Sequence, residues 1–127
     1  MEMIFILVSA SVLGADLGNL KSEIEKITAA KADQIHFDVM DGLFVDNISF
    51  GIPVLSAIKK YTKIEMDVHL MIQNPYKYID KFLDAGADII TFHVESNSNV
   101  FETIELIKSR NIKVGLSLRP GTPVETV

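Results

Sequence analysis

The chain has 127 residues, enough for one compact domain, and we expect residues 1–127 to belong to a single domain. Its net charge of −5 and scattered Lys and Arg residues argue against a nucleic-acid-binding surface, although backbone N–H groups can still bind a phosphate. A hydrophobic content of 48% excludes a disordered chain, and the absence of cysteine excludes disulfide chemistry and fits a cytoplasmic protein.

The apolar run from Met3 to Ala15 fits either a secretory signal or a first β-strand. A signal begins with positive charge, whereas the only early charge here is Glu2, so we expect a strand over residues 4–12. No apolar stretch is long enough to span a bilayer, and we expect no membrane partner.

Strand-like and helix-like segments alternate along the rest of the chain. The alternation of polar and apolar residues predicts further strands over residues 34–42, 65–72, 88–94 and 113–118. Helical spacing places apolar residues on one face of each intervening helix, namely Leu20, Ile24 and Ile27; Val54 and Ile58 after Pro53; Ile79 and Phe82 after Pro75; and Val100, Ile104 and Ile107. Thr122-Pro123 predicts the opening of one more helix.

A strand and a helix repeating about every 30 residues predict βαβ units and therefore a parallel sheet. A weak internal repeat agrees with this, because residues 31–38 resemble residues 86–93. In both segments the end of a helix passes through Ala-Asp into a strand with the same inside–outside phase.

One face of every expected strand is apolar, and the other face collects polar groups. The polar face carries Ser9 and Ser11, then His36 and Asp38, then Asp67, His69 and Met71, and finally Thr91, His93 and Glu95. A doubly wound sheet is covered by helices on both sides and needs both faces apolar. The pattern therefore favours a barrel with polar residues at the C-terminal ends of its strands, where barrel active sites lie.

Two imidazoles and a carboxylate in phase on neighbouring strands make His36, Asp38 and His69 candidate metal ligands. The alternative is a hydrogen-bonded core histidine with a buried ion pair, but burying all three groups without a ligand is costly. Asp67 and Glu95 are expected to orient these imidazoles as hydrogen-bond acceptors. His93 fits a pocket wall or a satisfied core residue equally well, so both roles stay open.

Met40 and Met71 occupy corresponding positions just past Asp38 and His69. Methionines in such positions usually fill the core, and at a barrel mouth they can instead cover a reactive intermediate. Asp41-Gly42 is a turn signal that carries no specific function by itself.

The sequence resembles the ribulose-phosphate 3-epimerase family over the whole chain, and the shared motifs follow one another in the family's order. The motifs that carry the likeness are Ser11 to Asp16, His36 to Asn47, Asp67-Val-His69-Leu-Met71, Gly86 to His93, and Leu118-Arg-Pro120-Gly-Thr122-Pro123. Two departures are Gly14, where the family usually has Ser, and Asp46, where it usually has Pro.

The resemblance implies a TIM (β/α)8 barrel that interconverts D-ribulose 5-phosphate and D-xylulose 5-phosphate in the pentose phosphate pathway. It implies that Asp38 is a catalytic acid/base that also touches a divalent metal held by His36 and His69. The metal is expected to be zinc, although iron, manganese or cobalt would suit the same ligands. Ser11, His69, Met40 and Met71 are implied to contact the sugar phosphate.

The chain holds only about the first five βα units, whereas a complete barrel needs about 200 to 250 residues. The family's second catalytic Asp and its phosphate-binding loops come from later strands, so we expect this chain alone to be inactive. Alternatives are an allulose-6-phosphate 3-epimerase, which shares the same site, or a non-catalytic metal-binding half-barrel. Open sheet edges also predict self-association into homo-oligomers.

Overall fold

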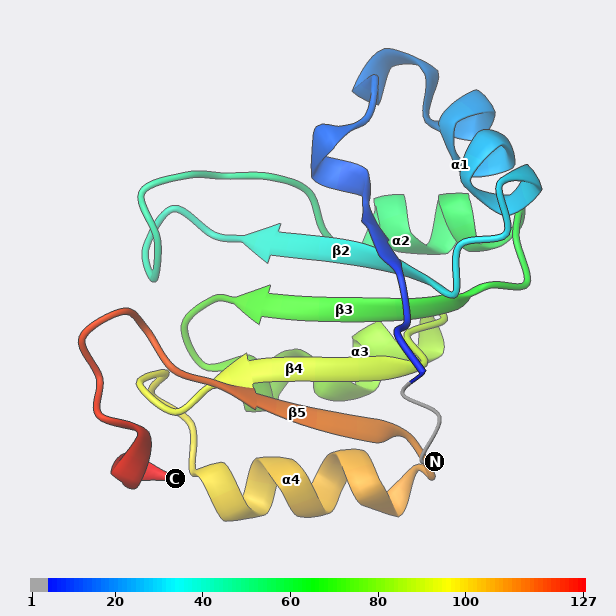
Figure 1. Ribbon diagram of the computed structural model, residues 1–127. Coiled ribbons are helices and arrows are strands. Elements are labelled where there is room, and N and C mark those ends of the chain that lie inside the picture. Colours follow the sequence, from blue (N-terminus) through cyan, green and yellow to red (C-terminus); the bar gives the residue numbers. More distant parts are fainter. Residues whose placement is uncertain (1–4) are drawn as a thin grey trace.

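A computed structural model describes residues 5–127 and contains one parallel sheet (Figure 1). The strands follow each other in sequence order across the sheet, and each pairs in parallel with the next. They are β1 (Ser9–Ser11), β2 (Gln34–Met40), β3 (Glu65–Met71), β4 (Ile89–His93) and β5 (Lys113–Ser117).

A helix follows each of the first four strands and returns the chain to the start of the next strand. The helices are α1 (Leu20–Ala29), α2 (Ile52–Lys59), α3 (Ile79–Asp84) and α4 (Val100–Ser109). Short 3₁₀ segments are η1 (Val12–Gly14), η2 (Leu17–Asn19), η3 (Pro75–Tyr78) and η4 (Val124–Thr126). Sequential parallel strands with a helix between each pair are the arrangement of a (β/α)8 barrel, here with β1 and β5 at the open edges, and the predicted fold class is confirmed. Within residues 5–127, no helix is both long enough and apolar enough to span a bilayer.

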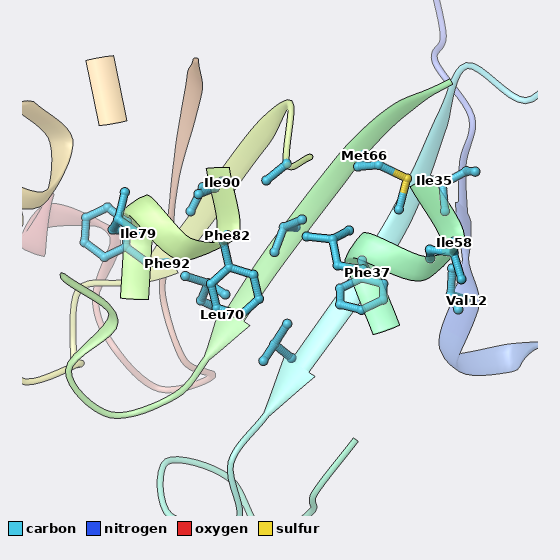
Figure 2. Close-up of a cluster of buried hydrophobic side chains, with 14 of the residues drawn as sticks. Val12, Ile35, Phe37, Ile58, Met66, Leu70, Ile79, Phe82, Ile90 and Phe92 are labelled. Atoms are coloured by element: carbon cyan, nitrogen blue, oxygen red, sulfur yellow. The ribbon is translucent and has the colours of Figure 1, made fainter. Parts of the chain in front are cut away.

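The hydrophobic core lies between the sheet and the helices (Figure 2). Phe37, Leu70 and Phe92 are completely buried on the strands, and Ile58 and Phe82 meet them from α2 and α3. The alternating apolar face therefore packs on the helices as predicted. On α2, Ile58 is buried and Val54 is half-buried against the core as predicted, and Leu55, which was not predicted, is fully buried as well.

The first strand is shorter than predicted. Residue 4 lies outside the described part of the chain, and β1 covers only Ser9–Ser11 before Val12 turns into a 3₁₀ segment and is buried. Residues 5–8 are 58–83% exposed. Because β1 is an edge strand with β2 as its one described neighbour, its apolar start has little surface to pack against, and regular pairing is confined to three residues.

The internal repeat corresponds to a repeated local structure. The residue just after the preceding helix, Lys31 or Gly86, has positive φ (59° and 110°), which ends the helix. The aspartate two positions later then accepts a hydrogen bond from a backbone N–H in the neighbouring strand or just before it. Asp33 Oδ2 accepts from the N–H of Val8 at 2.7 Å, and Asp88 Oδ2 accepts from the N–H of Met66 at 2.8 Å. Both aspartates thus fix the register of a strand with its predecessor.

Candidate metal centre

His36, Asp38 and His69 converge on one point of the polar face of the sheet. Alternation along β2 places His36 and Asp38 on the same face, and the parallel register pairs Asp38 with His69 on β3. Their side chains are 28%, 15% and 20% exposed, so each is largely but not completely shielded from solvent. The convergence predicted from the sequence is present in the structure.

Two ring nitrogens lie against one carboxylate oxygen. Nε2 of His36 is 3.1 Å and Nδ1 of His69 is 3.2 Å from Oδ1 of Asp38. Within residues 5–127 this is the one group of three whose ligand atoms all lie within 4.8 Å of one another. Two nitrogen donors and one oxygen donor are the ligand types of zinc and related divalent ions. The residues therefore fit a divalent cation.

Asp67 holds the other side of the His36 ring. Its Oδ2 lies 2.7 Å from Nδ1 of His36, and Ser9 donates a hydrogen bond to the same oxygen at 3.3 Å. The hydrogen bond to Asp67 raises the pKa of His36 despite its burial, and the same bond lowers the pKa of Asp67. A carboxylate that binds the second ring nitrogen leaves Nε2 of His36 to face Asp38, which is the usual support of a metal-binding histidine.

The pKa values of His69 and His93 shift in the opposite direction from that of His36. Burial lowers the pKa of His69, and burial followed by the proximity of His69 lowers the pKa of His93. Burial also raises the pKa of Glu95, but hydrogen bonds from Thr122 and the backbone N–H of Arg119 outweigh this and lower that pKa to about 2. Near pH 7 the two imidazoles are therefore neutral and Glu95 is ionised.

The residues expected to contact substrate lie around this group. The Ser11 hydroxyl faces Oδ2 of Asp38 at 3.5 Å, and Met40 is in register with Met71 at the ends of β2 and β3. The side-chain amide of Asn47 lies 3.5 Å from the sulfur of Met40. The residues expected to contact substrate thus lie at or near the C-terminal ends of β1, β2 and β3.

The model of the ribulose-phosphate 3 epimerase family matches residues 7–127. This chain belongs to the ribulose-phosphate 3-epimerase family. The match covers all the strands described above, so the family accounts for the order of strands and helices as well as for the individual motifs.

Curated members of the epimerase family are similar to almost the whole chain. A protein named ribulose-phosphate 3-epimerase from Rhodobacter capsulatus is 43% identical over 96% of this chain and 54% of its own length. The Bacillus subtilis protein of that name is 44% identical over 96% of this chain and 56% of its own. The cytoplasmic isoform of rice, Oryza sativa subsp. japonica, is 44% identical over 94% of this chain and 53% of its own. The chain therefore spans about half the length of the curated epimerases that it matches.

Asp41 has a structural role in this epimerase-family chain that the sequence did not reveal. Its Oδ1 accepts hydrogen bonds from the N–H groups of Leu43 (2.9 Å) and Phe44 (2.8 Å), and its Oδ2 accepts from that of Gln73 (2.8 Å). The turn signal indicated the two local bonds. The bond to Gln73 joins the loops that follow β2 and β3, and local sequence carries no signal for such a contact.

We expect Asp41→Ala to lower the free energy of unfolding by about 1.5–3 kcal/mol at pH 7, because three backbone donors lose a charged acceptor. Burial raises the pKa of Asp41, but the bonds from Gln73, Phe44 and Leu43 outweigh it and lower the pKa below its ordinary value of 3.8. The stability that comes from this shift is present above that ordinary value and lost as the pH falls through the lowered pKa. Urea unfolding at pH 7 and pH 3 measures both effects, with Asp46→Ala in the same loop as an exposed control.

Phe44 and Arg119 lie beside His93 and Glu95, and the sequence did not predict this contact. The Phe44 ring lies 5.1 Å from the His93 ring, and the Arg119 guanidinium lies 3.8 Å from the centre of the Phe44 ring. Arg119 also donates a side-chain hydrogen bond to the carbonyl oxygen of Phe44 and a backbone one to Glu95. Phe44, Glu95 and Arg119 lie in the loops that follow β2, β4 and β5, so no regular spacing in the sequence predicts this cluster.

Proposed function

We propose that this chain carries the metal-binding half of a ribulose-phosphate 3-epimerase, which interconverts D-ribulose 5-phosphate and D-xylulose 5-phosphate. The observation that carries the proposal is the approach of His36 and His69 to a single carboxylate oxygen of Asp38. Membership of the family supports the substrate class, and the neighbouring polar groups support the chemistry.

In this proposal Asp38 takes the proton from carbon 3 of the sugar. The C–H electron pair moves into the bond between carbons 3 and 2, and the carbonyl electrons move to oxygen, which gives a planar enediolate. A bound divalent cation, zinc in the first place, supplies a Lewis acid that polarises the carbonyl and offsets the negative charge. His36 and His69 would hold the cation, and Asp38 would serve as its third protein ligand.

Inversion of carbon 3 also needs a proton on the opposite face of the planar intermediate. In the described cluster the other two carboxylates are already engaged, Asp67 with His36 and Glu95 with the backbone of Arg119. We therefore propose that a second acid/base comes from outside this chain and that the isolated chain inverts carbon 3 very slowly. Losing one general acid/base costs about 10²–10⁴ in rate.

Contacts with substrate are proposed for four side chains. Ser11 is placed to hold Oδ2 of Asp38, and His69 lies beside the same carboxylate. Met40 and Met71 are half-buried at the strand ends, where their thioethers would limit the access of water to the intermediate.

The experiment follows ribulose 5-phosphate by proton NMR in D₂O with added Zn²⁺, using the Bacillus subtilis relative as a positive control. We expect the chain to exchange the carbon 3 proton for deuterium while forming xylulose 5-phosphate about 10²–10⁴ times more slowly than the control. Inversion at the rate of the control contradicts the need for a second acid. Absence of exchange at saturating substrate contradicts proton transfer by this chain and favours a non-catalytic half-barrel.

We also propose a cytoplasmic location and self-association for this chain. A cytoplasmic location is supported by the absence of cysteine and by the rice relative, which is named as a cytoplasmic isoform. Self-association is supported by the edge strands β1 and β5 and by the exposed apolar side chains of Phe5 and Ile6. A purely monomeric sedimentation profile would contradict the self-association.

A further inference from the structure

His93 is a nearly buried histidine that contacts the candidate metal centre from the next strand. It ends β4 and is 8% exposed. Its Nε2 lies 2.8 Å from Nε2 of His69, and the two rings are stacked with centroids 5.0 Å apart. A contact this short between two ring nitrogens requires one Nε2–H to donate and the other Nε2 to accept.

The surroundings of His93 determine which ring donates. Its Nδ1 faces Oε2 of Glu95 at 3.5 Å, and neither atom has a hydrogen-bond partner among the described residues. An ionised carboxylate at this position favours a proton on Nδ1 of His93. A neutral His93 with its proton on Nδ1 has a free lone pair on Nε2. Asp38 also lies 3.2 Å from Nδ1 of His69, but a His69 that held a cation through Nδ1 would carry its proton on Nε2, and His69 would then be the donor.

The tautomer of His69 determines which of its nitrogens can bind a metal. If His69 carries its proton on Nε2, its Nδ1 has a free lone pair, and Nδ1 is the atom that lies 3.2 Å from Oδ1 of Asp38. We propose that His93 is a positioning residue, which accepts a hydrogen bond from His69 and so presents the Nδ1 lone pair of His69 to a divalent cation. Glu95 would hold His93 in the matching tautomer. The proposal rests on the proposed function, because it takes His69 as a metal ligand.

The competing explanation is that His93 only fills space. Its ring packs on Phe44, which also lies under the Arg119 guanidinium, and an aromatic ring without nitrogen could occupy the same volume. His93→Phe keeps the ring and removes the acceptor. His93→Gln loses the ring but keeps an acceptor oxygen at about the position of Nε2. The two variants therefore separate hydrogen bonding from packing.

The test measures Zn²⁺ affinity of the 127-residue chain by competition with a chelating dye, with circular dichroism to confirm that each variant is folded. We expect His93→Phe to bind Zn²⁺ about 10–100-fold more weakly than the unsubstituted chain and His93→Gln to stay within about threefold of it. Nitrogen NMR of the zinc-loaded chain gives a readout of tautomers. We expect protons on Nε2 of His69 and on Nδ1 of His93.

Each other outcome overturns the proposal. Zinc affinity of folded His93→Phe within threefold of the unsubstituted chain removes the positioning role, and so does a proton on Nδ1 of His69. Equal weakening in folded His93→Gln and His93→Phe assigns His93 to packing alone. If the unsubstituted chain binds no Zn²⁺, the metal site of the proposed function fails and this proposal fails with it. A proton on Nδ1 of His69 in the zinc-loaded chain likewise removes that atom as a ligand, whereas the two affinity results on the His93 variants leave the metal site intact.

Discussion

Asp38→Asn is expected to lower zinc-dependent exchange of the carbon 3 proton by about 10²–10⁴-fold. The substitution keeps the size of the side chain and one oxygen, but an amide has no basic oxygen to take a proton. Asp38 is well placed for the loss to be large, because both imidazoles approach the same Oδ1 and its Oδ2 faces Ser11.

A matched control separates this effect from a general loss of negative charge. Glu65→Gln makes the same chemical change on β3, but Glu65 lies at the opposite end of the strand, where Lys113 donates to it at 2.7 Å. We expect exchange within about twofold of the unsubstituted chain for this variant, since surface ion pairs contribute little. Zinc content is measured in parallel. An Asp38→Asn protein that retains zinc and exchanges at the original rate would remove Asp38 from the chemistry.

His69→Ala is expected to weaken Zn²⁺ binding by at least about 100-fold, because loss of a ligand should exceed the 10–100-fold cost of losing a supporting group. The reason is geometric. The remaining pair, His36 and Asp38, both lie on β2, so the cation would lose its attachment to the neighbouring strand.

Elemental analysis and dye competition measure the loss of zinc. Thr91→Val serves as the control, because Thr91 is in register with His69 on β4 and the change keeps its volume while removing a hydroxyl. We expect this control to bind zinc as the unsubstituted chain does. Unchanged zinc stoichiometry in His69→Ala would show that His69 is not a ligand.

Strand and helix periodicity in the sequence predicted part of the site and part of the core correctly. The alternation in β2 and β3 placed His36, Asp38 and His69 on one face, and a one-residue error would have turned them toward the helices. The buried Ile79 and Phe82 of α3 were predicted equally well, because helical spacing reports a buried face directly. The start of β1 was predicted too long, because an apolar run gives no sign of whether neighbouring structure exists to cover it.

What the sequence alone determined is the alternation of strands and helices, the polar face of the sheet and the three candidate ligands, all of which follow from periods of 2 and 3.6 residues. Only the tertiary structure decided which nitrogen of each imidazole faces Asp38, that Asp41 joins two loops through Gln73, and that His93 touches His69. Strand pairing sets Thr91 rather than His93 opposite His69, so that contact depends on how the side chains lean across the sheet. The local sequence determines which face of its strand each residue occupies, whereas atomic contacts between strands arise only when the strands assemble into the sheet.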